Sequence, residues 1–326
     1  MKNIINYLRH RHDTALLGAS FILLILAMIN PTLPLPHNIY NYLLVADISQ
    51  SMNTVDTTID NKPASRMAYT QYMMRNVIST LPCGTKVSIG LFVGASIAAL
   101  YTPIEVCKNY SSIEDTIDHL DWRSGWSGNS RLRESMLSIA KTIRGFPEPA
   151  QVVFFTDGEE APRLHVFNTR DLSNFQGGDG WLLVGIGSSK GTPIPKLDEH
   201  NQLIGYWAGD SFALQPGIAQ ISEANIGTRN DSVANSESDR YLSKLDEEYL
   251  KSLAKEVHGQ YVRGDNIQNL SSAMSTQKPA RRAVAPYDLQ LILASLAGLI
   301  LIIAYLPKHP ANELRIFLTK WKSKAS

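Results

Sequence analysis

Two patterns of apolar residues alternate along the middle of the chain. Continuous apolar runs of four to eight residues are typical of strands buried on both faces, and an apolar residue at every third or fourth place is typical of a helix with one buried face. Strands separated by such helices favour a doubly wound, mainly parallel α/β sheet. The predicted strands are 39–46, 150–156, 180–187 and a hairpin within 84–106, and the predicted helices are 65–81, 112–120, 130–143 and 245–259.

Polar oxygen side chains follow the first predicted strand. Asp47, Ser49 and Ser51 stand at two-residue intervals at its end. Alternate residues of a strand face the same way, so we expect the three side chains to converge at the carboxyl edge of the sheet. Ligands of doubly wound folds bind outside that edge.

Two further segments are expected at the same edge. Asp157 follows the strand 150–156, and Gly158 lets the chain turn at once. Ser130 lies in a loop before a predicted helix, where it offers a hydroxyl or caps that helix. Two carboxylates and three hydroxyls suit a hard divalent cation that keeps a position open for a partner's oxygen. The alternative is that all three segments are ordinary turns.

The two cysteines flank the predicted hairpin. Folding it about a turn at Gly94 and Ala95 places Cys83 and Cys107 opposite each other, which predicts a disulfide. Disulfides require an oxidising compartment, and two buried free thiols are the alternative.

The ends of the chain carry uncharged apolar runs, 14–36 and 289–307. Each is long enough to cross a bilayer, and no small-residue cleavage site follows the first, so we expect an uncleaved anchor rather than a signal peptide. Basic residues before the first run and after the second place both termini in the cytoplasm. The expected organisation is a cytoplasmic tail (1–13), a transmembrane anchor (14–36), a periplasmic domain (37–276) with an insertion (188–244), a linker (277–288), a transmembrane helix (289–307) and a basic cytoplasmic tail (308–326), in the inner membrane.

Composition narrows the function. The formal net charge is +1, and the middle of the chain has no basic block, which excludes nucleic acid as a partner. The sequence contains no phosphate-binding glycine-rich loop, and its histidines are scattered. A binding module is therefore expected rather than an enzyme, with a metal-dependent hydrolase as the contrasting class.

The segments "DISQS", "GNSRL" and "FFTDG" resemble the three motifs of the metal-ion-dependent adhesion site in von Willebrand factor type A domains. The resemblance covers about 39–274 and implies that Asp47, Ser49, Ser51, Ser130 and Asp157 bind a divalent cation. Mg²⁺ is the expected ion, with Ca²⁺ or Mn²⁺ as alternatives, and a partner protein supplies a carboxylate. The family usually has threonine where Ser130 stands.

A narrower resemblance is to the MxaL type of this family, whose members are encoded with periplasmic methanol dehydrogenase. It involves the stretch 100–130, the "TDGEEAP" turn and 193–207. That resemblance implies maturation of the enzyme by calcium insertion, together with other von Willebrand type A proteins and a MoxR-class ATPase. A general membrane-stress or aerotolerance protein of the Bat type is the alternative.

The insertion 188–244 is longer than a usual loop of the family. Its segment 196–207 predicts a hairpin that turns at His200 and Asn201, and 224–240 is polar enough to be a mobile loop. Such a hairpin near the metal edge would add partner-specific surface, and a decorative insertion is the alternative.

Overall fold

The structure is a computed structural model of the 326-residue chain and describes residues 12–127, 129–164, 166, 169–212 and 232–305. The chain separates into two compact units, Asn38–Arg281 and the combination of Met1–His37 with Arg282–Ser326. Each unit is described by itself. Of the two expected cytoplasmic tails, 308–326 and all but the last two residues of 1–13 lie outside the described residues.

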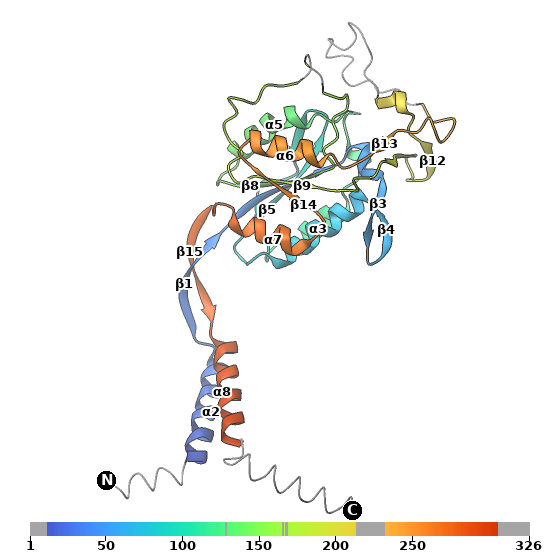
Figure 1. Ribbon diagram of the computed structural model, residues 1–326. Coiled ribbons are helices and arrows are strands. Elements are labelled where there is room, and N and C mark those ends of the chain that lie inside the picture. Colours follow the sequence, from blue (N-terminus) through green and yellow to red (C-terminus); the bar gives the residue numbers. More distant parts are fainter. Residues whose placement is uncertain (1–11, 128, 165, 167–168, 213–231, 306–326) are drawn as a thin grey trace, which may run out of the picture. The chain divides into compact units, whose positions relative to one another are not determined.

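A seven-stranded sheet runs through the larger unit (Figure 1). Its order is β14–β9–β8–β2–β5–β6, and β7 pairs with β5. The strands from β14 to β5 are parallel, whereas β6 and β7 run antiparallel to β5. The prediction of a mainly parallel α/β sheet is therefore confirmed. The bounds are β2 (Asn41–Asp47), β5 (Lys86–Val93), β6 (Ser96–Ala99), β7 (Ile104–Glu105), β8 (Gln151–Thr156), β9 (Leu182–Gly185) and β14 (Gln260–Arg263).

Helices cover both faces of this sheet, with α3 and α7 on one side and α5 and α6 on the other (Figure 1). The period of two in β2 shows why both faces need cover. Leu44 and Ala46 belong to the core under α3, α4 and α7, and Leu43 and Val45 belong to the core under α5 and α6. The helix bounds are α3 (Arg66–Thr80), α4 (Tyr110–Asp118), α5 (Leu132–Arg144), α6 (Glu247–Glu256) and α7 (Ile267–Thr276).

All four predicted helices are present, but β14, α7 and a hairpin after β2 are among the elements that were missed. The edge strand β14 contains one aliphatic residue, Val262, so it lacks the apolar run that identifies a buried strand. The helix α7 follows β14, and its sequence is also largely polar, so no apolar pattern marked its start. A hairpin of β3 (Val55–Ile59) and β4 (Lys62–Ser65) turns at Asp60 and Asn61, which both have positive φ.

The predicted disulfide is confirmed at the edge of the sheet opposite β14. β5 and β6 pair with Val93 opposite Ser96, so the turn lies at Gly94 and Ala95 as expected. Cys83 and Cys107 form a disulfide with their Cα atoms 5.3 Å apart. The bond joins the segment before β5 to the segment after β7, and therefore closes the end of this antiparallel extension.

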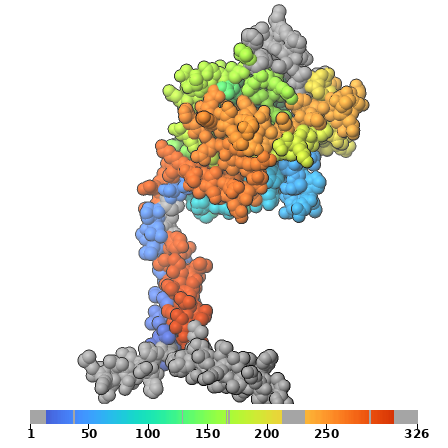
Figure 2. All heavy atoms as spheres, viewed as in Figure 1, coloured from blue at the N-terminus to red at the C-terminus, as the bar shows by residue number. Residues whose placement is uncertain are grey.

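The insertion contains short strand pairs. β10 (Thr192–Pro193) pairs with β13 (Leu242–Ser243), and the predicted hairpin is present as β11 (Pro195–Leu197) and β12 (Leu203–Tyr206), followed by a 3-10 turn, η3 (Gly209–Phe212). The hairpin tip docks on η2 (Trp122–Ser124), because the Trp122 indole donates to Asn201 Oδ1 at 3.0 Å. Figure 2 shows insertion residues, in yellow-green and yellow, beside the blue β3–β4 hairpin. Residues 224–231 of the expected mobile loop lie outside the described residues.

The smaller unit contains α2 (His12–Ile29), β1 (Thr32–Ile39), β15 (Arg281–Asp288) and α8 (Gln290–Tyr305). β1 pairs with β15, and α2 contacts α8, where Ser20 donates to the Ala297 carbonyl at 3.1 Å.

The apolar run 14–36 is divided between the helix α2 and the strand β1. α2 ends at Ile29 because Asn30 has a φ of 49° and Pro31 disfavours helical geometry before it. Within the described residues, no helix combines the length and the apolarity needed to cross a membrane. The two expected spans are therefore not confirmed.

Candidate metal and partner-binding site

Asp47 ends β2 at the carboxyl edge of the sheet and is completely buried. Its Oδ1 accepts a hydrogen bond from the Ser49 backbone at 2.9 Å, and its Oδ2 accepts one from the Thr156 hydroxyl at 2.7 Å. Thr156 is the last residue of the neighbouring parallel strand β8. The carboxylate is therefore fixed between the ends of two strands.

Ser49 and Ser51 lie together, but for a different reason from the one expected. The strand stops at Asp47, and the chain enters a 3-10 turn, η1 (Gln50–Asn53), in which the Met52 amide donates to the Ser49 carbonyl. This turn, rather than strand alternation, brings the two buried hydroxyls to an Oγ–Oγ distance of 3.1 Å.

Asp157 follows β8 and is also fully buried. Its Oδ1 accepts from the Glu159 amide at 3.0 Å, and its Oδ2 accepts from the Arg66 guanidinium at 2.7 Å. The sharp turn after it depends on Gly158, which has a φ of 81° and whose missing Cβ would lie 2.8 Å from Leu250 Cγ.

Ser130 reaches this region through backbone pairing. It forms a parallel bridge with Gly94, directly after β5, and it exchanges both backbone hydrogen bonds with Ala161. The interpretation of Ser130 as a helix cap is wrong, because Arg131 occupies the cap position of α5. Ser130 is 3% exposed. Its hydroxyl has no hydrogen-bond partner within the described part of the chain. A buried hydroxyl without a partner is costly unless a ligand satisfies it.

Arg66 is a residue that the sequence analysis missed. It begins α3, its side chain is fully buried, and it contacts Asp157. A usable signal existed, because Arg66 lies in register with Thr70, Met73 and Val77 on the buried face of the predicted helix. An arginine at such a position requires acidic partners, since an unpaired buried charge is strongly unfavourable.

The electrostatics of the site favour an added cation. Burial, and next the charge of Asp157, raises the pKa of Asp47 to about 7. Burial and Asp157 also raise the pKa of Glu159 to about 7. Burial opposes the charge on Arg66, but Asp157 and Asp56 raise the pKa of the guanidinium above its ordinary value. An added cation would relieve the unfavourable interaction of these buried carboxylates with one another.

The donor set fits a hard divalent ion. Asp47 and Asp157 supply carboxylates, and Ser49, Ser51 and Ser130 supply hydroxyls, which are the ligand types that Mg²⁺, Ca²⁺ and Mn²⁺ accept. The Ser130 hydroxyl, buried and unpartnered, is the feature of this set that an ion would satisfy. Elsewhere among the described residues, a close group of Cys83, Glu105 and Cys107 includes both sulfurs of the disulfide, so it is no competing metal site.

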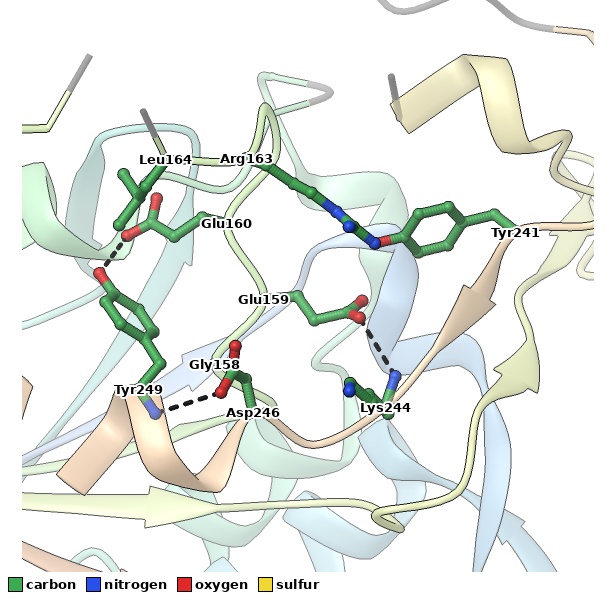
Figure 3. A pocket seen from close by; sticks show the side chains of 9 residues that line it. All are labelled: Gly158, Glu159, Glu160, Arg163, Leu164, Tyr241, Lys244, Asp246 and Tyr249. Carbon is green, nitrogen blue, oxygen red and sulfur yellow. Dashed lines mark hydrogen bonds between the residues drawn. The ribbon is translucent and has the colours of Figure 1, made fainter. Parts of the chain in front are cut away.

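A polar pocket of about 350 Å³ adjoins the Asp157 loop, since Gly158, Glu159 and Glu160 line it (Figure 3). The Tyr249 hydroxyl donates to Glu160 at 2.6 Å, and the Lys244 amide donates to Glu159 at 3.1 Å. The remaining lining residues are Arg163, Leu164, Tyr241 and Asp246. The pocket is thus lined by the loop after Asp157, by the insertion and by the start of α6.

The family model of the von Willebrand factor type A domain matches residues 42–160, a segment that includes all five candidate ligands. Similar proteins include a UPF0353 protein of Mycolicibacterium paratuberculosis, 24% identical over 271 residues, which are 82% of this chain and 68% of that protein. Another is a UPF0353 protein of Mycobacterium sp. (strain KMS), 31% identical over 160 residues, which are 47% of this chain and 45% of that protein. The resemblance to this domain is confirmed at the level of the matched segment.

Solved structures that are similar to this chain include two from Bacteroides species. An aerotolerance-related membrane protein of Bacteroides fragilis has a TM-score of 0.46 and 16% identity, covering 73% of this chain and 98% of that chain. The BatB protein of Bacteroides thetaiotaomicron has a TM-score of 0.49 and 17% identity, covering 72% of this chain and 97% of that chain.

Proposed function

We propose that this chain, which carries a von Willebrand factor type A segment, is a metal-dependent protein-binding module. The observation that carries the proposal is the buried Ser130 hydroxyl, which has no hydrogen-bond partner among the described residues and lies at the same sheet edge as two buried carboxylates. Asp47, Ser49, Ser51, Ser130 and Asp157 would hold a divalent cation, with Mg²⁺ as the first candidate. The ion, when bound, supplies the positive charge to which a carboxylate of a partner protein attaches.

Binding rather than catalysis is supported by how the hydroxyls are engaged. Ser49 and Ser51 bond to each other, and Ser130 is unpartnered, so in the described part of the chain none of the three is paired with a general base. A serine nucleophile is commonly activated by such a base within hydrogen-bond reach, and these three hydroxyls lack that activation among the described residues. Turnover of generic ester substrates in the presence of Mg²⁺ or Mn²⁺ would instead favour a metal-dependent hydrolase.

We infer further that the partner is a periplasmic enzyme under maturation, with calcium insertion into methanol dehydrogenase and a MoxR-class ATPase as the specific proposal. Its support is the residue pattern in 100–130 and 193–207. The docked hairpin tip on Trp122 and the polar pocket beside Asp157 offer surface next to the ion for such a partner. A Bat-type role in membrane stress is the alternative, and it would use the same ion with a different partner.

The proposed location is the inner membrane, with the larger unit in the periplasm. The helices α2 and α8 support anchoring, because they leave large apolar side chains exposed, among them Phe21 at 64% and Leu291 at 79%. A surface of this kind is unfavourable in water and suits lipid or another apolar partner. The disulfide supports an oxidising compartment.

The test of the function is capture of purified methanol dehydrogenase by the full chain in detergent. Wild-type protein with Mg²⁺ should retain the enzyme, and a chelator should release it. Asp47→Ala should abolish capture, because one protein carboxylate would then be left to hold the ion. Asp115→Ala is the matched control, since that side chain is 76% exposed on α4 and capture should persist.

Capture that survives both Asp47→Ala and chelator, in protein shown to be folded by circular dichroism, would contradict the metal-bridge mechanism. If the wild type binds Mg²⁺ but never the dehydrogenase, the maturation role is wrong while the metal-dependent module stands. That second result would favour the Bat-type alternative.

A further inference from the structure

The guanidinium of Arg66 is shared between two buried carboxylates. Its Nε and Nη2 donate to Asp56, with the shortest distance 2.7 Å, and its Nη1 donates to Asp157 Oδ2 and to Ser243 Oγ, each at 2.7 Å. The arginine side chain is 0% exposed, and those of Asp56 and Asp157 are 4% and 0% exposed. One cation therefore serves two anions inside the protein.

The position of this arginine is closely confined. A Cβ on Gly187 would lie 2.5 Å from Arg66 Nε, so the guanidinium lies against bare backbone just after β9. The Ser188 amide donates to Asp56 Oδ2 at 2.9 Å, which fixes the second carboxylate from the same segment. Arg66 thus has little freedom to leave either anion, and Ser243 adds a contact from the end of the insertion.

The two carboxylates differ in their relation to the metal edge. Asp157 is a candidate ligand directly after β8, whereas Asp56 lies in the β3–β4 hairpin and is not in the candidate ligand set. The strength with which Arg66 attracts Asp157 depends on how much of the arginine's positive charge Asp56 already compensates. In a buried, low-dielectric setting such competition is strong.

We propose that Arg66 is a positioning residue that holds Asp157 and competes with the ion for its charge, and that Asp56 tunes the competition by compensating part of the positive charge of Arg66. This inference rests on the proposed metal site and deepens it, because it identifies what sets the affinity for the ion. Asp56 would thus promote ion binding without touching the ion. The arginine would stabilise the buried Asp157 when no ion is bound.

The proposal predicts effects of opposite sign on ion affinity. Asp56→Asn leaves Arg66 with Asp157 as its nearest anion, so Arg66 should hold that carboxylate more strongly and the affinity for Mg²⁺ and Mn²⁺ should fall, by roughly five- to tenfold. Adding Arg66→Met to Asp56→Asn removes the competitor, so the double variant should bind these ions at least as tightly as the wild type.

The experiment is isothermal titration of Mg²⁺ and Mn²⁺ into the full chain in detergent, with circular dichroism to establish folding. The single variant Arg66→Met would leave two buried carboxylates without a cation, so the double variant is used to avoid that cost. Glu148→Gln is the matched control. It also removes a carboxylate from an ion pair, with Lys86, but it contacts Asn41 at the amino end of β2, and ion affinity should stay unchanged.

A purely structural role for Arg66 would weaken binding in both variants. An affinity of Asp56→Asn equal to or above that of the wild type overturns the inference, as does a double variant that binds no tighter than Asp56→Asn. Absence of divalent ion binding by the wild type is a separate result, which overturns the proposed metal site itself.

Discussion

Ser130 and Asp157 reach the same edge of the sheet under different constraints. Backbone pairing with Gly94 and Ala161 holds Ser130, and its hydroxyl has no hydrogen bond within the part of the chain that the structure describes. Asp157 is held through its side chain by Arg66. At the scale of single residues, the hydroxyl should therefore be replaceable by another hydroxyl, while the carboxylate depends on a second charged residue.

Substitution of Ser130 tests the first part of this expectation. Ser130→Thr keeps the oxygen and should bind Mn²⁺ within about twofold of the wild type, whereas Ser130→Ala should weaken binding by roughly tenfold, as loss of a single supporting group at metal sites does. Titration calorimetry on the two variants measures the difference. Equal affinities for the alanine and threonine variants would remove Ser130 from the ligand set.

At the scale of elements, the antiparallel extension of the sheet depends on a covalent bond. β6 and β7 are short, and each pairs with β5 alone within the sheet. Short edge strands contribute little stability by themselves. The bond between Cys83 and Cys107, which are 24 positions apart in sequence, closes a loop that contains both strands. This loop restricts the conformations of the unfolded chain.

Replacing both cysteines by serine should lower the free energy of unfolding by about 3 kcal/mol, the value expected for closure of a loop of this length. Urea unfolding measures the loss, and reduction of the wild type should reproduce it. In intact cells, labelling of Cys83 and Cys107 should require prior reduction. Labelling without a reductant would show that the bond is absent in the compartment where the protein resides.

At the scale of the whole molecule, the two ends of the chain form a unit of their own. α2 and α8 contact each other and expose many large apolar residues, while β1 pairs with β15. The larger unit buries its apolar residues in two cores on either side of the sheet. The contrast supports different surroundings for the two units, lipid for the helices and water for the sheet domain.

A topology experiment tests this proposal. A reporter that is active only in the cytoplasm should function when fused after Ser326, because five basic residues follow the second apolar run. A matched fusion at Asp60, in the exposed β3–β4 turn of the larger unit, should be inactive. A silent fusion after Ser326 with an active one at Asp60 would reverse the orientation, and activity of both would exclude membrane insertion.

The core of the fold follows directly from local pattern. The strand around Leu44 and the helix that begins at Arg66 were predicted because their apolar residues recur with the period of the element they form. β14 escaped prediction because pairing with β9, rather than its own polarity, makes it a strand. The spacing of the cysteines also indicated the disulfide, since their symmetry about a predicted turn needs no tertiary information.

The residues of the candidate site also fall into those that local sequence predicts and those that only the packing of the elements reveals. The sequence by itself determined which oxygen side chains stand at the ends of strands, and hence Asp47 and Asp157, because strand ends and turn glycines are local features. Only the tertiary structure decided that the Ser130 hydroxyl has no partner among the described residues and that Arg66 compensates Asp157 across 91 positions of sequence. Contacts between residues distant in the chain depend on how the elements pack, and no local period records which charges a buried arginine will meet.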